Sequence, residues 1–517
     1  MRNAVKICIL VYLYVLLQMP AIAVNSISVE YRQDALDYGV EKEHYIRTCA
    51  TIASDKTEVN ATVVQSNGKK YATWSCMLQG EYVAIAGGHY FIHNGAGLLL
   101  GKASAYNPDP YSINIQKNDT FISLCKSGNP QYTMYGMVTS LYDVRDVTTV
   151  RLDAGVSYKE CYVTIEDAQN KIYPYSIHGL LSHFERDGIY TEPVQVMTSF
   201  VHATAKPIQY VTLQGCYYAT QVYYNNARIF FNADSQENYA MKLFGGYSLY
   251  AQYQDNIISI FSEYAVSHVL MANEDDSKNR YGKAYYCGAI IKEKRYILKS
   301  IIQRSDKDFF APFGNTFGGN SPRDIYYYSV SVKPVKKIIC SWAYTDQNNL
   351  LPSSYYIEYP HKCINKIWMA YKNKNFSIKS DYRYAQFYKD GRENKGSRLQ
   401  QGVVWGITRN SSLHVKYGLY HGDTSAWYAA SGIGIKFGNL QNDIGALYAH
   451  TEGEKMYVVM LPLPQTNIIS ETIATSSFFV VMRLRFSNAF CKLSARFVSE
   501  LYPQKQTAGE LSAAAFF

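Results

Sequence analysis

The sequence is poor in charge and lacks the long apolar runs that membrane helices need. Charged residues make up only 18% of its 517 residues, whereas hydrophobic residues make up 47%. Beyond the N-terminus no stretch reaches the roughly 20 consecutive apolar residues of a membrane-spanning helix. If this chain crosses a membrane, it must do so with β-strands closed into a barrel, which satisfies every backbone hydrogen bond without water.

The sequence also lacks the motifs of several enzyme and metal-binding classes. It contains no G-x-S-x-G, no H-E-x-x-H and no phosphate-binding G-x-x-x-x-G-K-[ST] motif. Its cysteines form no C-x-x-C pair, and no spacing of histidine and cysteine suggests zinc. We therefore predict neither an enzyme nor a bound metal or cofactor.

The N-terminus has the form of a secretory signal. Two positive charges precede an apolar run from Ile7 to Leu17, and Ala21-Ile22-Ala23 is a small-x-small cleavage site. We expect residues 1–23 to be removed and Val24 to begin the mature chain. Removal of two cations and no acids lowers the formal charge from +9 to +7. Because the remaining charge is spread along the chain, no nucleic-acid partner is indicated.

Tyrosine is the residue present in excess, with 49 copies. Its apolar ring and wet hydroxyl suit strands and interfaces. The stretch from Asp324 to Tyr344 shows how the tyrosines are used, because strand side chains alternate with period two. One face of this predicted hairpin carries Tyr326, Tyr328, Val330, Trp342 and Tyr344.

This face is aliphatic near the expected turn, Lys333 to Lys336, and aromatic far from it. Such a pattern is typical of strands that face lipid, with an aromatic rim at the membrane–water boundary. In this interpretation Val330 faces lipid and Ser329 points inward. The alternative is a soluble sandwich hairpin with one half-buried face.

The same pattern recurs through the C-terminal half, with short turns expected at 373–375 and 409–412 and arms of about ten residues. We therefore predict an all-β fold: a single large antiparallel transmembrane β-barrel, covering residues 24–502, after a cleaved signal peptide. About 18–26 strands would fit, with the short turns together on the periplasmic side. Residues 503–517 are either a C-terminal tail or the last strand.

Three segments also resemble a known family. They are GGHYFIHNGAGLLLG from Gly87, GGYSLYAQYQDNIISIFSEYAVS from Gly245 to Ser267, and the segment from Phe309 to Asp346 that begins FFAPFGNTF. They are similar to segments of the large outer-membrane barrels of Bacteroidota-type bacteria that usually carry a helix-hairpin-helix region before the barrel. The resemblance implies an outer-membrane barrel. The helix-hairpin-helix region is not recognisable here, so its DNA-related role is not carried over.

The charged residues Lys379, Asp381 and Arg383 alternate with apolar side chains on one predicted strand. Three charges facing lipid would be costly, so in a barrel they would face the lumen, where they either tune ion selectivity or pair with one another. The expected function is a porin-like pore or transporter, or an anchor for envelope proteins, in the cell outer membrane. Its partners would be the lipid bilayer and an unknown solute or envelope protein.

The alternative function is that of a secreted, soluble, β-rich adhesin or other binding glycoprotein. Four N-glycosylation sequons support it, and they begin at Asn60, Asn118, Asn375 and Asn410. Extraction of the protein with detergent would separate the two hypotheses.

Overall fold

The structure is a computed structural model of the whole chain. It describes residues 24–34, 43–53, 56–66, 69–101, 122–125, 133–145, 148–166, 171–178, 185–186, 189–223, 241–271, 280–314, 322–350, 361–389, 392–421, 425–451, 476–487, 491–502 and 507–515. The predicted signal peptide, residues 1–23, lies outside this part. No helix long and apolar enough to cross a membrane occurs in the described residues.

All described regular structure is β-strand, in 27 strands of one sheet. Three strands stand outside the main ring: β6 (Ile122–Leu124), β9 (Lys171–His178) and β10 (Glu185–Arg186). The others, in chain order, are β1 (Val24–Asp34), β2 (Glu43–Ala53), β3 (Thr57–Ser66), β4 (Lys69–Gln79), β5 (Val83–Ile92), β7 (Met134–Arg145), β8 (Thr148–Glu166), β11 (Ile189–Ile208), β12 (Val211–Tyr223), β13 (Met241–Gln254), β14 (Ile258–Met271), β15 (Arg280–Lys292), β16 (Tyr296–Ser305), β17 (Arg323–Val335), β18 (Ile338–Asn349), β19 (His361–Lys372), β20 (Phe376–Lys389), β21 (Arg392–Gly406), β22 (Ser411–His421), β23 (Ser425–Phe437), β24 (Leu440–Thr451), β25 (Ser476–Ser487), β26 (Cys491–Tyr502) and β27 (Thr507–Ala515).

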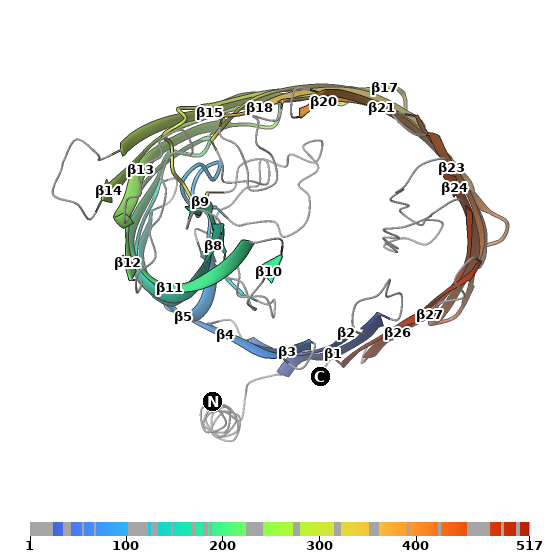
Figure 1. The fold of residues 1–517 in the computed structure, drawn as a ribbon, viewed down its shortest axis with the longest axis horizontal. Helices are drawn as coiled ribbons and strands as arrows, with labels where there is room; N and C mark the ends of the chain where they lie inside the picture. Colours follow the sequence, from blue (N-terminus) through green and yellow to red (C-terminus); the bar gives the residue numbers. More distant parts are fainter. Residues whose placement is uncertain are drawn as a thin grey trace.

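The main ring is a closed antiparallel barrel. Each strand pairs with the next along the chain, with β5 joined to β7 and β8 joined to β11 around the three extra strands. The last strand, β27, pairs with the first, β1, from Ile27 opposite Ala515 to Gln33 opposite Gly509. Of the 27 described strands the remaining 24 therefore form the ring, an even number within the predicted range (Figure 1).

Residues 503–517 were expected to form either a tail or the last strand. The structure makes Thr507–Ala515 the strand that completes the ring, with hydrogen-bonded neighbours on both sides. Its sequence is small and polar, so its strand conformation depends on these two neighbours. A strand buried between partners can override a weak local preference.

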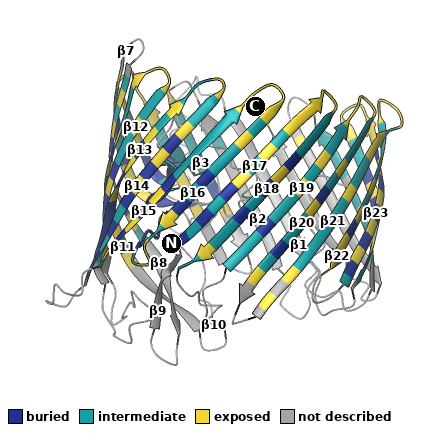
Figure 2. Cartoon of the chain, turned by 90° about the horizontal axis from the view of Figure 1, so that it is seen from above, coloured by how far each residue is buried: buried dark blue, intermediate teal, exposed yellow. Residues whose placement is uncertain are grey.

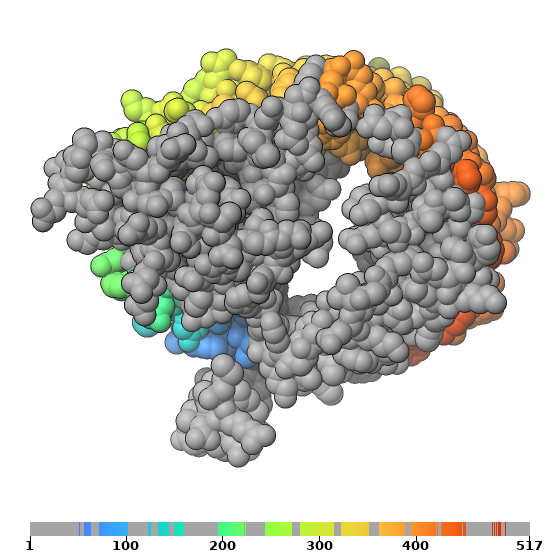
Figure 3. Space-filling model, in the orientation of Figure 1, coloured from blue at the N-terminus to red at the C-terminus, as the bar shows by residue number. Residues whose placement is uncertain are grey.

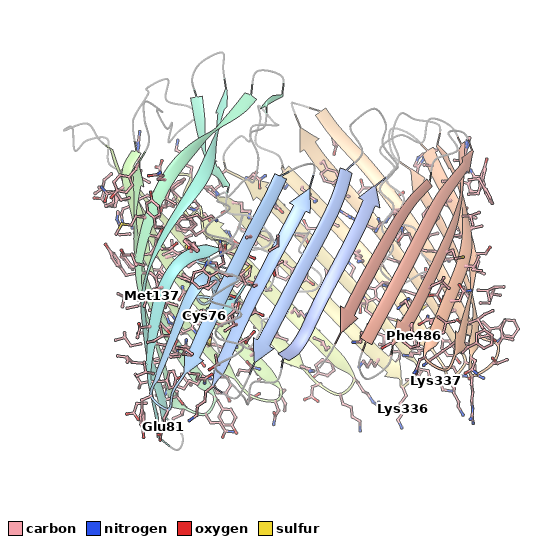
Figure 4. The ribbon with its side chains drawn as sticks, turned by 90° about the horizontal axis from the view of Figure 1, so that it is seen from below. Cys76, Glu81, Met137, Lys336, Lys337 and Phe486 are labelled. Carbon is pink, nitrogen blue, oxygen red and sulfur yellow. The ribbon has the colours of Figure 1, made fainter. Side chains whose placement is uncertain are left out.

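The short turns lie together on one rim of the barrel, which we call the short-turn rim. Backbone hydrogen bonds join neighbouring turns there, including Lys333 N to Arg295 O (2.6 Å), Lys372 N to Lys337 O (2.8 Å) and Gly406 N to Asn375 O (2.7 Å). In the side view Glu81, Lys336 and Lys337 mark this rim (Figure 4). The opposite end, where connections such as 350–360 and 452–475 begin and end, we call the long-connection rim.

The turn of the hairpin β17–β18 lies later than the sequence predicted. Strand β17 continues to Val335, which pairs with Ile338, so the turn is at Lys336 and Lys337 rather than at 333–336. The register shifts between Val332 and Val335, where Pro334 cannot donate a ladder hydrogen bond. Proline therefore produces an irregularity within the strand instead of ending it.

The two faces of the wall differ as the alternation predicted. On β17 Val330 is 36% exposed and lies opposite Trp342, which is 40% exposed, whereas Tyr327 is buried on the other face. Exposed and buried positions also alternate along other strands of the ring (Figure 2). Leu249 on β13 and Ile367 on β19 are examples of exposed apolar side chains. A contiguous apolar outer surface on a closed barrel is the architecture of an outer-membrane protein.

We expect an arginine to be far better tolerated on the inner face than on the outer face. Val330→Arg should lower the free energy of unfolding by about 2–4 kcal/mol, because the charge would enter the apolar middle of the bilayer. Ser329→Arg, one residue away, should have a much smaller effect. Urea titration of the barrel folded into lipid vesicles measures both. Equal losses would show that the two residues do not face different solvents.

Candidate functional site

The inner face of the barrel has two unlike sectors. The sector from β5 to β17 carries a buried apolar core, whereas the sector from β19 to β25 carries charged side chains. Aromatic rings dominate the core: Phe244 packs edge-on against Phe310 at 5.1 Å and against Tyr218 at 6.4 Å between ring centroids. An apolar core within the lumen needs chain to cover it, and two segments of this protein do so.

The first inward segment, residues 93–101, is held by a buried carboxylate. Glu263 on β14 accepts hydrogen bonds from the backbone N–H groups of Ala96 (2.7 Å) and Leu98 (3.4 Å). Gly95, in the same turn, has a φ of 50°, and a Cβ there would lie 2.8 Å from a Glu263 oxygen. Only glycine fits this approach, and the result is a turn whose backbone donors converge on one carboxyl group.

Further contacts fix the same segment to the wall. Asn94 donates to Ser248 Oγ at 2.6 Å, and Gly95 N donates to Gln214 Oε1 at 2.9 Å. Leu98 and Leu99 are buried in the core described above. The glycine-rich stretch is therefore a packed insert on the inner side of the barrel.

The second inward segment, residues 306–314, joins the first. Ser267 Oγ, also on β14, accepts a hydrogen bond from Phe310 N at 2.8 Å. Gly101 N donates to Phe313 O at 2.9 Å, which links the two segments directly. Gly282 on β15 lies against the Phe309 backbone, where no side chain would fit. The two inward segments thus form one unit anchored mainly to β14.

The three segments that resemble Bacteroidota-type barrels meet in this unit. Glu263 and Ser267 belong to the second of them and hold the first and the third, at Ala96 and Phe310. The sequence could not show this meeting, because the three segments are far apart along the chain. In this structure their motif residues act in packing the lumen.

A buried polar cluster lies on β7, β8 and β11 in the filled sector. Asp153 accepts hydrogen bonds from Ser140, from Arg151 Nε (2.8 Å) and from His202 Nδ1 (2.9 Å). Ser140, Asp153 and His202 are all buried. Ser140 donates to the carboxylate rather than to the imidazole, so these groups are not arranged as a nucleophile and its base.

The predicted lumen residues Lys379, Asp381 and Arg383 all lie on the inner face of β20. Each shares the parity of buried Ala385, opposite to that of exposed Tyr382. Lys379 also places its ammonium 5.9 Å from the centre of the Trp368 ring on β19. Asp381 is almost fully buried within the wall.

The pairing of Asp381 differs from the expectation. The sequence suggested a partner on its own strand, Lys379 or Arg383. In the structure Asp381 forms ion pairs with Lys366 Nζ on β19 (3.2 Å) and, more loosely, with Arg398 Nη2 on β21 (4.0 Å). Diagonal neighbours on adjacent strands are within reach of long side chains, and the register places both cations there.

Three cations of this sector, Lys366, Arg398 and Lys416, were missed from the sequence. Lys366 and Arg398 lie directly opposite the predicted Arg383 on its two neighbouring strands. Lys416 on β22 lies opposite Gly402, which in turn lies opposite Lys379. Their inward parity on each strand was the available signal. The register between neighbouring strands decides which of these side chains lie opposite one another, and the sequence alone did not give this register.

We call these five residues, Lys366, Lys379, Arg383, Arg398 and Lys416, the cationic wall. Asp381 is the carboxylate that the structure describes among them on β19–β22. Like charges directly opposite each other on neighbouring strands are unfavourable. Asp381 offsets part of this repulsion through its ion pairs with Lys366 and Arg398.

The residues predicted to form an aromatic rim lie on the outer face of β17 and β18. Tyr326, Tyr328, Trp342 and Tyr344 share the outer face with Val330. Tyr328 lies opposite Tyr344, while Tyr326 lies opposite Asp346, near the long-connection rim. The Tyr326 hydroxyl accepts a hydrogen bond from Arg304 Nε at 2.7 Å, as a polar boundary requires.

The described residues do not fill the whole interior of the ring. In the space-filling view down the short axis of the molecule, no described residue crosses the gap inside the ring (Figure 3). The filled sector and the cationic wall occupy different parts of the ring, so the inward segments do not consume the whole lumen.

Comparisons with known proteins give structural likeness alone. No family model matches the chain, and no curated protein matches it. The resemblance to Bacteroidota-type barrels therefore stays a prediction.

The solved structures to which the chain is similar include two receptors and a translocation pore. The siderophore receptor PirA from Pseudomonas aeruginosa has 7% identity and a TM-score of 0.48, with 97% of this chain and 81% of that chain covered. The P pilus usher PapC translocation pore has 9% identity and a TM-score of 0.43, with coverage of 96% and 98%. The ferric-catecholate import receptor Fiu from E. coli K12 has 9% identity and a TM-score of 0.38, with coverage of 95% and 81%. The fold described here stands on the chain's own strand pairings.

We expect Glu263→Ala to release the first inward segment. The N–H groups of Ala96 and Leu98 would lose a buried acceptor, at a cost of about 1–3 kcal/mol in unfolding free energy. Because the segment fills part of the lumen, single-channel conductance in planar bilayers should rise at the same time.

The matched control is Glu293→Ala, at an exposed short turn between β15 and β16. It should change neither stability nor conductance. If Glu263→Ala left both quantities equal to those of the control, the carboxylate would not anchor the segment.

Proposed function

We propose that this protein is an outer-membrane pore that admits small anionic solutes. The observation that carries the proposal is the cationic wall on β19–β22, on the inner face of strands outside the filled sector. The sequence left open whether these charges pair within a closed lumen or tune the passage of ions. Five cations on the inner face of four adjacent strands support the second alternative.

The outer surface supports a place in the bilayer. Among the described side chains, exposed apolar residues lie on the outer face of strands from β3 to β24, and large exposed apolar areas are unfavourable in water. This surface argues against the alternative of a soluble adhesin or secreted glycoprotein. In the proposed orientation the short-turn rim faces the periplasm and the long-connection rim faces outward, as in bacterial outer-membrane barrels.

The partial filling of the lumen supports a pore of restricted size. A ring of this strand number is wide, and barrels of 22 strands are commonly plugged. Here the two inward segments occupy the sector from β5 to β17, and no described residue fills the part of the ring beside them (Figure 3). A solute that enters this opening would pass close to the cationic wall.

The positions of the cations suit a surface that attracts anions without trapping them. Lys379 and Lys416 lie beside the aromatic rings of Trp368 and Tyr428, at 5.9 and 5.8 Å from the ring centres. Aromatic faces hold a cation in place without neutralising its charge. Conduction needs this balance, because a solute must bind well enough to enter and weakly enough to leave.

Loss of two wall cations should reduce anion selectivity. In planar bilayers under a potassium chloride gradient, the current through the wild-type protein should have a reversal potential of the sign expected for an anion-selective pore. Lys379→Gln combined with Arg383→Gln should move the reversal potential toward that of a cation-selective pore, because two charges leave the lumen.

The control removes the same charge from the short-turn rim, as Lys336→Gln with Lys337→Gln. Its effect should be clearly smaller. A wall variant that behaves like this control would contradict the proposed role of the wall. If the purified wild-type protein conducts nothing, the pore is wrong and an anchoring or assembly role for the barrel replaces it.

A further inference from the structure

A second group of polar side chains lies on the outer face, away from the lumen. Asp346 on β18 and His361 and Cys363 on β19 bring three different ligand atoms within 4.8 Å of one another. Cys363 lies directly opposite Asp346, and His361 lies two residues along the same strand. The period of two puts all three on the face of Tyr344, at the polar side of the aromatic rim.

The distances among the three ligand atoms resemble the edges of a zinc site. Cys363 Sγ lies 3.7 Å from Asp346 Oδ1 and 3.6 Å from His361 Nε2. A tetrahedral zinc ion with ordinary bond lengths would hold sulfur about 3.6 Å from nitrogen or oxygen. Asp346 Oδ1 and His361 Nε2 are 2.7 Å apart, which is a hydrogen-bond distance. To bind the same zinc ion, these two atoms would need to move apart by about 0.6 Å.

That adjustment is within reach of the side chains. Asp346 and His361 are each about one-third exposed, at 31% and 36%, so rotation of either does not disturb a packed core. The backbone need not move, because the ladder already fixes the two strands side by side. The exposed side of the group leaves room for water as a fourth ligand.

The chemistry of the donor set selects the kind of ion. A thiolate, an imidazole and a carboxylate together suit zinc and similar borderline ions, whereas calcium and magnesium prefer oxygen alone. Tyr344 adds a hydroxyl 4.0 Å from Cys363 Sγ, so the sulfur also has a polar neighbour. A cluster of this composition is unusual on the outer face of a barrel, which is otherwise apolar.

The sequence concealed the group for two reasons. His361 and Cys363 are spaced as H-x-C, which is not a familiar zinc motif, although period two puts both on one face of a strand. Asp346 joins them only through the register of β18 with β19. The sequence-based expectation of no metal site therefore lacked the third ligand.

We propose that Asp346, His361 and Cys363 form a binding site for zinc or a similar divalent ion at the outer boundary of the barrel. The ion would link β18 to β19 near their ends at the long-connection rim. This site is independent of the lumen and of the proposed pore.

Cobalt is the most direct probe, since cobalt bound to a thiolate gives a charge-transfer absorption in the near ultraviolet. We expect the reduced full-length protein in detergent to show this absorption on titration with Co²⁺ and to lose it when Zn²⁺ is added. Cys363→Ser should abolish the signal. His361→Ala should weaken Co²⁺ binding by at least about tenfold, because loss of a ligand costs more than loss of an outer-shell partner.

Cys340→Ser is the matched control, because Cys340 shares the outer face of β18 but pairs with Met369 away from the group. It should keep the cobalt signal. In the unmutated protein Zn²⁺ should also protect Cys363, and not Cys340, from alkylation mapped by mass spectrometry. An absence of thiolate absorption in the wild type, its persistence in Cys363→Ser, or alkylation of Cys363 unchanged by Zn²⁺ would overturn the proposal.

Discussion

The structure depends on the closure of one hydrogen-bonded ring. In a bilayer each unpaired backbone N–H or C=O costs several kcal/mol, so a sheet can cross only if it has no free edge. The pairing of β27 with β1 removes the last edge, although β27 is rich in alanine and small polar residues. Closure also fixes the rest: once the ring is shut, every strand has one face toward lipid and one toward the lumen.

The inner face is therefore free to differ around the ring, and it is apolar and covered in one sector and charged in another. From β5 to β17 the inward side chains are largely apolar and are covered by the two inward segments. A buried carboxylate, Glu263, makes this possible because it satisfies backbone donors that would otherwise be stranded in the lumen. From β19 to β22 no such cover is needed, since Lys379, Arg383 and their neighbours can face water.

The sequence predicted what depends on local alternation and missed what depends on register. Period two was sufficient to place Val330 outside and Lys379 inside, and short turns between arms of about ten residues were sufficient to predict a barrel. The partners of Asp381, on β19 and β21, could not be predicted, because a shift of one pairing step brings different side chains together. The same limit concealed Asp346 beside Cys363 and the contact of Glu263 with residues 96–98. The turn of the β17–β18 hairpin was misplaced because Pro334 was taken as a strand end, whereas the strand continues past it.

If the barrel lies in a membrane as described, one strand, β20, separates lipid from an aqueous lumen. Spin labels attached singly at positions 378–383, in protein folded into liposomes, would test it through collision rates with oxygen and with a water-soluble nickel chelate. The structure predicts that oxygen collides more often with labels at the even positions and the chelate with labels at the odd positions, in strict alternation. Collision rates that do not alternate, or that rise and fall together, would contradict a wall between lipid and water.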